Sequence, residues 1–186
     1  MEIQRLEEIT FVDYIYSSNS IEEEGYMYVC VEARLLESDG KIRDIIGESS
    51  IILFDSAWEN DSYIGVADAI DQEKHDLMVE ADNFFELENF RRIAVLDKLY
   101  IKEDYQNKGY GTELLGSIKE YLMEVLHVEA VLLLAASIKN GATGAEKILL
   151  DEKVKEFYRK NGYTQFTDKN FYIVDEDLDD FLIYRE

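Results

Sequence analysis

Residues 106–111 have the composition of a loop that can bind phosphate. They read Gln-Asn-Lys-Gly-Tyr-Gly and stand between a strand-like and a helix-like segment. Gly109 and Gly111 let the backbone turn so that consecutive N–H groups point inward at the positive end of a helix dipole, and that geometry binds phosphate. A glycine pair before a helix is also typical of a simple tight turn. Both interpretations stay open on this observation alone.

The same residues disfavour two common nucleotide sites. A P-loop ends in Gly-Lys followed by Ser or Thr, and a dinucleotide-binding loop contains three glycines. Gly109 and Gly111 complete neither pattern. If the loop binds phosphate, the ligand therefore belongs to another class.

Asp97 is a carboxylate in an unfavourable position. It lies in the strand-like segment 92–101 and shares the parity of that segment's apolar residues, which are Ile93, Val95, Leu99 and Ile101. A regular strand would turn Asp97 towards the apolar face, where a charge needs a partner or a function. A β-bulge or a structural pairing would resolve the conflict, and so would a role as the base that orients or deprotonates a substrate.

The segments around these residues predict alternating strands and helices. Residues 92–101 are rich in β-formers, and residues 112–126 place apolar side chains along one face of a helix. Residues 128–136 are a nearly continuous apolar run, which is typical of a central strand in parallel pairing. A charged helix is predicted over residues 147–161, with Gly162 as its left-handed stop.

The N-terminal half predicts a hairpin followed by a helix. Residues 26–36 and 45–54 are strand-like and flank Asp39-Gly40, a pair that favours a tight reversal. Residues 62–85 fit helical spacing better than alternation. Cys30, the single cysteine, lies in the apolar run of the first of these strands and is expected to be buried there. A role as nucleophile is disfavoured, because nothing near it in sequence supplies a base.

Two motifs resemble the GNAT superfamily of acyl-CoA-dependent N-acetyltransferases. Residues 106–111 match in full the family signature Gln/Arg-x-x-Gly-x-Gly/Ala between a strand and a helix. Residues 156–163, Glu-Phe-Tyr-Arg-Lys-Asn-Gly-Tyr, look like the family's Phe-Tyr-x-Lys-x-Gly-Phe/Tyr helix end. The resemblance covers about residues 92–166, and two motifs in the family's order are more specific than either one.

The resemblance implies a mixed α/β fold, with a central mixed sheet, splayed parallel strands and flanking helices. We expect one domain over residues 1–186, with a cofactor-binding core at about 92–166 and a divergent N-terminal part at 1–91. That part departs from the family because no helix pair is evident between the first two strands. The acceptor site is therefore the least predictable feature.

The resemblance also implies a cosubstrate, acetyl-CoA. In the family, the loop amides hold the coenzyme A pyrophosphate, and the preceding strand pairs with the pantetheine arm. The cofactor positions that follow are Leu99, Tyr100, Ile101, Gln106, Asn107, Lys108, Gly109, Tyr110, Gly111 and Thr112. No metal is expected, because His75 and His127 lie in no ligand pattern.

Two residues are candidates for catalytic roles, Tyr158 from the resemblance and Asp97 from its position in the strand. Tyr158 matches the tyrosine that, in many members, gives a proton to the departing thiolate, although simple core packing beside Phe157 is the competing interpretation. Asp97 would act on the amine that attacks the thioester directly in a ternary complex. A bulge, which the family often has in this strand, would instead turn Asp97 elsewhere.

The charge of the chain restricts its partners. Nineteen Lys and Arg face 41 Asp and Glu, which gives a formal net charge of −22. Such a protein repels nucleic acids and anionic membranes and attracts cations. We expect an amine-bearing small molecule or peptide as acceptor, possible homodimers as among similar proteins, and a cytoplasmic location, because no apolar run is long enough to span a bilayer. The alternative is a catalytically silent acidic scaffold that binds a basic protein or mimics nucleic acid.

Overall fold

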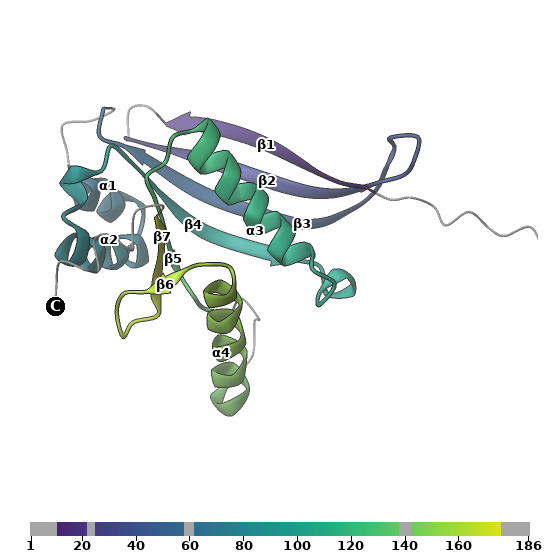
Figure 1. Ribbon diagram of the computed structural model, residues 1–186. Helices are drawn as coiled ribbons and strands as arrows, with labels where there is room; N and C mark the ends of the chain where they lie inside the picture. Colours follow the sequence, from purple (N-terminus) through teal and green to yellow (C-terminus); the bar gives the residue numbers. More distant parts are fainter. Residues whose placement is uncertain (1–10, 22–24, 58–61, 138–142, 176–186) are drawn as a thin grey trace, which may run out of the picture.

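Seven strands form one mixed sheet in the computed structural model, which describes residues 11–21, 25–57, 62–137 and 143–175 (Figure 1). The strand order is β1-β2-β3-β4-β5-β7-β6, and only β4 and β5 pair in parallel. The strands are β1 Phe11–Ile21, β2 Tyr26–Leu36, β3 Ile42–Asp55, β4 Arg92–Ile101, β5 Ala130–Leu134, β6 Thr164–Gln165 and β7 Phe171–Asp175. The predicted mixed α/β fold is confirmed.

Helices cover both faces of the sheet. They are α1 Tyr63–Ile70, α2 Gln72–Phe85, α3 Tyr110–Glu120 and α4 Gly144–Lys160, with short 3-10 turns at Leu87–Asn89 and Glu103–Tyr105 and a π-helical turn at Tyr121–Val125. Figure 1 shows α3 lying across the sheet, while α1 and α2 sit together beside the end at which β4 starts.

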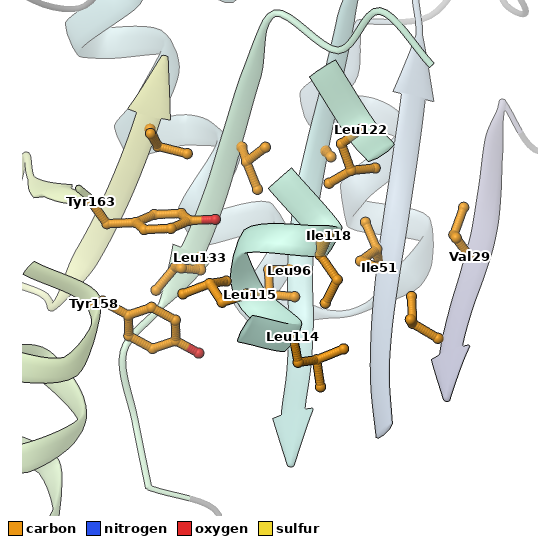
Figure 2. Packing of buried hydrophobic residues seen from close by; sticks show 14 of the residues in the cluster. Val29, Ile51, Leu96, Leu114, Leu115, Ile118, Leu122, Leu133, Tyr158 and Tyr163 are labelled. Atoms are coloured by element: carbon orange, nitrogen blue, oxygen red, sulfur yellow. The ribbon is translucent and has the colours of Figure 1, made fainter. Parts of the chain in front are cut away.

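Two apolar cores hold these layers together. Leu114, Leu115 and Ile118 of α3 share one core with Tyr158 of α4 and with one face of the sheet (Figure 2). The other core joins α1 and α2 to the opposite face, where Leu77 and Met78 are fully buried. The apolar stripe predicted for the helix after the glycine loop is therefore the stripe that packs on the sheet.

The helix predicted over residues 62–85 is two helices. Asp71 separates them with an extended backbone, and its side chain accepts a hydrogen bond from the Lys74 amide at 2.9 Å, which caps α2. Helices α1 and α2 lie between β3 and β4 along the chain, which agrees with the helix predicted after the hairpin. In the described residues, two helices therefore follow the third strand of the sheet.

Two further expectations need correction. Cys30 is exposed, because its side chain points to the face of β2 opposite the buried residues Val29 and Val31. Strand β1, at the edge of the sheet, was not predicted, although Val12, Tyr14 and Tyr16 share one face and pack against the α3 core. Ile15 lies between the two tyrosines and is exposed, so the sequence shows no clear alternation of apolar and polar residues.

Candidate functional site

Strand β4 is paired on both sides along only half of its length. It pairs with β5 from Ile93 to Leu96, opposite Ala130 to Leu133, and beyond that point its only strand partner among the described residues is β3. The edge that faces away from β3 borders a cleft of about 690 Å³ between β4 and α4. Its lining includes Lys98, Leu99, Tyr100, Ile101, Gln106, Leu150 and Val154.

A β-bulge at Asp97 marks the point where β4 leaves β5. Ser50 of β3 pairs with Lys98 and Ile51 pairs with Leu96, so Asp97 is an extra residue without a partner in the register. The strand therefore does not keep a single parity. Ile93 and Val95 pack in the core under α1 and α2, whereas the apolar residues after the bulge, Leu99 and Ile101, contact the core under α3.

The carboxylate of Asp97 has two partners on neighbouring elements. Lys74 of α2 places its Nζ 2.5 Å from Asp97 Oδ1, and the Ser50 hydroxyl donates to Oδ2 at 3.1 Å. Both explanations that resolve the parity conflict structurally, a bulge and a pairing, are thus present together. The sequence did not predict Lys74 or Ser50, because each lies more than 20 residues from Asp97 and only the fold brings them together.

The glycine loop has the backbone conformation of an anion-binding turn. Asn107 and Gly109 have positive φ values of 58° and 92°, and α3 starts directly after them at Tyr110. No side chain caps α3, and the consecutive N–H groups of residues 107–111 have no hydrogen-bond partner in the described part of the chain. Free N–H groups at the positive end of a helix attract phosphate.

Contacts on either side fix the loop in place. The Gln106 side chain donates to the carbonyl of Ile101 at 2.8 Å, which ties the loop to the end of β4. A Cβ at Gly111 would lie 3.6 Å from the Phe157 ring, so α3 and α4 approach closely there. Thr112 differs from the residues before it, because its amide already donates to the Gly109 carbonyl at 2.9 Å.

Lys108 is the basic side chain of the loop. Its Nζ lies 5.5 Å from the centroid of the Tyr105 ring, and no carboxylate in the described ranges pairs with it. By contrast, Lys102 beside the loop is engaged by Asp44 at 2.8 Å. Lys108 is thus the cation available to a phosphate group bound by the loop amides.

Tyr158 lies on the inward face of α4 and is 8% exposed. Its ring makes edge contacts with Phe157 and Tyr163, at centroid distances of 5.2 and 5.6 Å. Figure 2 shows the hydroxyl directed towards Leu114 and Leu115 of α3, and it has no hydrogen-bond partner among the described residues. Burial raises the pKa of this phenol well above its ordinary value, so it is neutral at pH 7.

The structure therefore brings most of the predicted residues to one place. Leu99, Tyr100, Ile101 and Gln106 line the cleft, and the loop amides follow Gln106 directly. Tyr158 lies in the core shared by α3 and α4, next to the cleft residue Val154 of the same helix. Among the residues that the structure describes, no group of three or more His, Cys, Asp or Glu could hold a metal ion, and no helix is long and apolar enough to cross a membrane.

Comparison with known proteins gives one family match and several distant structures. The profile of the acetyltransferase (GNAT) domain matches residues 49–165, which is more than half of the chain. No curated protein sequence matches the chain significantly.

The solved structures that resemble the chain share little sequence with it. The KacTA–DNA complex is 15% identical over 84% of this chain and 74% of that one, with a TM-score of 0.46. The structure of AtaTR bound with AcCoA is 14% identical over 83% and 72%, with a TM-score of 0.41. The dodecameric spermidine N-acetyltransferase from Vibrio cholerae is 11% identical over 89% and 72%, with a TM-score of 0.42.

Proposed function

Because the chain belongs to the GNAT acetyltransferase family, we propose that it transfers the acetyl group of acetyl-CoA to a primary amine. One observation carries the proposal: the open edge of β4 lines a cleft, and the loop with unpartnered N–H groups starts directly after Gln106, which lines the same cleft. A pyrophosphate at the loop and an extended arm along the strand edge fit these two surfaces in that order.

The residues of the core at 92–166 take separate parts in binding. The amides of residues 107–111 hold the pyrophosphate, and Lys108 adds a positive charge beside it. The open edge of β4 at Leu99, Tyr100 and Ile101 offers backbone groups to the amide-containing pantetheine arm, as a further strand would. Thr112 contributes through its exposed side chain, because its amide is already bonded.

The reaction that this arrangement supports is a direct displacement. The amine nitrogen forms a bond to the thioester carbonyl carbon, a β4 amide stabilises the oxyanion, and the carbon–sulfur bond then breaks. Tyr158 protonates the departing thiolate. Burial makes this phenol a weaker acid than usual, so it gives up its proton only as negative charge develops on the departing sulfur. The nitrogen loses a proton to solvent as the amide forms, and the phenolate takes a proton back from solvent, which balances the transfer.

We propose that the acceptor is a cationic molecule, of which one primary amine is neutral when it attacks the thioester. The carboxylate of Glu103 lines the cleft, where Glu48 is already paired with Lys98, and the formal net charge of −22 draws cations to the protein. Asp97, in contrast, already binds Lys74 and Ser50, which favours a structural role over that of a base. The family match gives no support to the alternative of a silent acidic scaffold, while homodimers and the exclusion of nucleic acid stay predictions.

The proposal is tested by following free coenzyme A thiol when the protein is mixed with acetyl-CoA and a panel of mono- and polyamines. We expect thiol release that depends on the amine and on protein concentration, together with an acetylated amine of mass increased by one acetyl group. If the protein binds acetyl-CoA but no cationic amine accelerates thiol release above the amine-free rate, the assigned reaction is wrong.

A further inference from the structure

Lys74 joins α2 to the bulge of β4 through an ion pair. Its side chain is 9% exposed, and its Nζ lies 2.5 Å from Asp97, 3.2 Å from Glu73 and 3.3 Å from Asp71. Burial disfavours the charged ammonium, but the hydrogen bond and charge of Asp97, aided by Glu73, outweigh it and raise the pKa of Lys74. Lys74 is therefore a permanently charged partner for the bulge carboxylate.

Three elements meet at this carboxylate. Lys74 comes from α2, Ser50 from β3 and Asp97 from β4. The preceding residue, Leu96, is the last of β4 that pairs with β5, and the following residue, Lys98, is the first that lines the cleft. The contacts thus hold the backbone at the vertex where the two parallel strands separate.

We propose that Lys74 is a positioning residue of the cleft: by holding Asp97 it fixes the bulge, and the bulge fixes where the acetyl group of the cosubstrate lies. This inference rests on the function proposed above. Lys74 is not among the residues that line the cleft, and its ion pair with Asp97 joins it to β4, so it acts through Asp97 and the backbone of that strand.

The dimensions of β4 place the acetyl group near the bulge. A strand rises about 3.3 Å per residue, so Asp97 lies about 13 Å from Ile101 along β4. The pyrophosphate end of the cosubstrate binds beyond Ile101, at the loop, and the arm runs back along the strand edge towards the vertex. The thioester is thus the part of the molecule that a shift of the bulge displaces most, and a misplacement of about 1 Å can cost about 100-fold in rate.

The competing role for Asp97 is that of a general base. The two roles predict opposite effects of Asp97→Asn when Lys74 is already replaced. If Lys74 only pairs with the partly exposed carboxylate of Asp97 and holds it, Lys74→Met leaves that charge without its partner, and adding Asp97→Asn removes the charge and restores part of the loss. If Asp97 is the base, adding Asp97→Asn lowers turnover further.

The experiment compares the affinities for acetyl-CoA and for free coenzyme A by isothermal titration. The variants are Lys74→Met, Lys74→Arg, Asp97→Asn and the double variant Lys74→Met/Asp97→Asn. Lys169→Met is the matched control, because Lys169 also forms an ion pair with α2, through Glu80 at 2.5 Å, but lies outside the cleft lining.

We expect Lys74→Met to weaken acetyl-CoA binding roughly five- to tenfold and coenzyme A binding less than about twofold, since only the former carries the acetyl group. The acetyl-CoA affinity of Lys74→Arg, which keeps the charge, should lie between those of Lys74→Met and the unsubstituted protein. The same is expected of the double variant. Lys169→Met should bind acetyl-CoA as tightly as the unsubstituted protein. Should Lys74→Met fail to fold, Asp97→Asn and Lys74→Arg give the same comparison between the two ligands.

Equal weakening of both ligands, or no difference from Lys169→Met, would overturn the positioning role of Lys74. The thiol-release assay described above is run on the same variants, and a double variant that turns over more slowly than Lys74→Met would also overturn the positioning role and would make Asp97 the base. If the unsubstituted protein binds neither ligand, the proposed function itself is wrong, and the inference falls with it.

Discussion

The two halves of strand β4 have different surroundings and different tasks. Residues Ile93 to Leu96 are buried and paired on both sides, by β3 and β5. The residues from Asp97 to Tyr100 are partly or fully exposed, and beyond the bulge the strand borders a cleft on the side away from β3. One strand thus supplies the centre of the core with its first half and a binding edge with its second, and a single extra residue divides them.

The division means that fold and function can be damaged separately. Beyond the bulge only Ile101 is buried, whereas Ile93 to Leu96 are all buried and lie towards the opposite end of the strand from the glycine loop. Substitutions beyond the bulge should therefore change catalysis more than stability. Substitutions at the start of β4 should change stability more than catalysis.

The largest difference between the effect on catalysis and the effect on stability is expected for Tyr158→Phe. Removal of the phenol hydroxyl takes away the proton donor, and we expect kcat to fall about 1000-fold with little change in acetyl-CoA affinity or in the melting temperature. Steady-state kinetics with the best amine of the panel measures the effect.

Tyr163→Phe is the control for this substitution. Tyr163 contacts the Tyr158 ring and is 2% exposed, but its buried hydroxyl has no hydrogen-bond partner among the described residues. Its removal should leave kcat unchanged and leave stability equal or slightly higher. Equal losses in the two variants would show that ring packing, and not the acidic proton, explains the effect.

The next largest effect, a loss of stability, is expected for Asp55→Asn. Asp55 ends β3 and is paired with Arg92, the first residue of β4. Asp55 is 3% exposed and accepts from Arg92 Nε at 2.5 Å, and Arg92 also donates to the Leu126 carbonyl at 2.7 Å. Breaking a buried pair of this kind costs about 3 kcal/mol in the free energy of unfolding. Denaturant unfolding should show this loss while the acetyl-CoA affinity of the folded protein stays constant.

The same carboxylate predicts a pH dependence. Burial works to raise the pKa of Asp55, but hydrogen bonds from the Ala57 amide and Arg92 outweigh it and lower that pKa below its ordinary value. A group with a depressed folded-state pKa stabilises the protein above its unfolded pKa of about 3.9, and this contribution is lost as pH falls further. The stability of Asp55→Asn should depend less on pH below about 4, and an unchanged acid limb would contradict the assignment.

The smallest effect concerns Gly116 in the middle of α3. A Cβ there meets no atom within 4 Å, and its φ is not positive, so Gly116→Ala should raise the free energy of unfolding by about 0.5 to 1 kcal/mol. Thermal unfolding measures the change. Because Gly116 lies away from the loop, a change in acetyl-CoA affinity would show that α3 and the loop are not independent.

The sequence predicted the local features of the fold well. The bounds of β4 and β2, the helix after the glycine loop and the left-handed Gly162 all depend on side-chain types and spacing within one segment, and each is confirmed. The assignment of the cofactor positions came from the resemblance of residues 106–111 to a known family.

Features that depend on pairing between distant segments could not be predicted in the same way. The sequence left open whether β4 is regular or bulged at Asp97, because the bulge is defined by the register with Ser50 and Ile51 of β3. Lys74 was missed because an apolar pattern says nothing about which charged residue of a helix will meet a carboxylate on a strand. The acceptor site depends on such contacts, and for that reason its lining could not be predicted from the sequence.

The most direct test of the cofactor site is titration of acetyl-CoA into the unsubstituted protein, Gly109→Glu and Gly40→Glu. Gly40 is the matched control: its φ of 81° is also positive, a Cβ there meets nothing within 4 Å, and it lies in the turn between β2 and β3. Both variants therefore carry similar backbone strain and the same added charge. We predict saturable binding to the unsubstituted protein and to Gly40→Glu, and at least about 100-fold weaker binding to Gly109→Glu, because a carboxylate at the loop repels the pyrophosphate. Equal affinities for acetyl-CoA in all three proteins would contradict the assignment of the loop as the cofactor site.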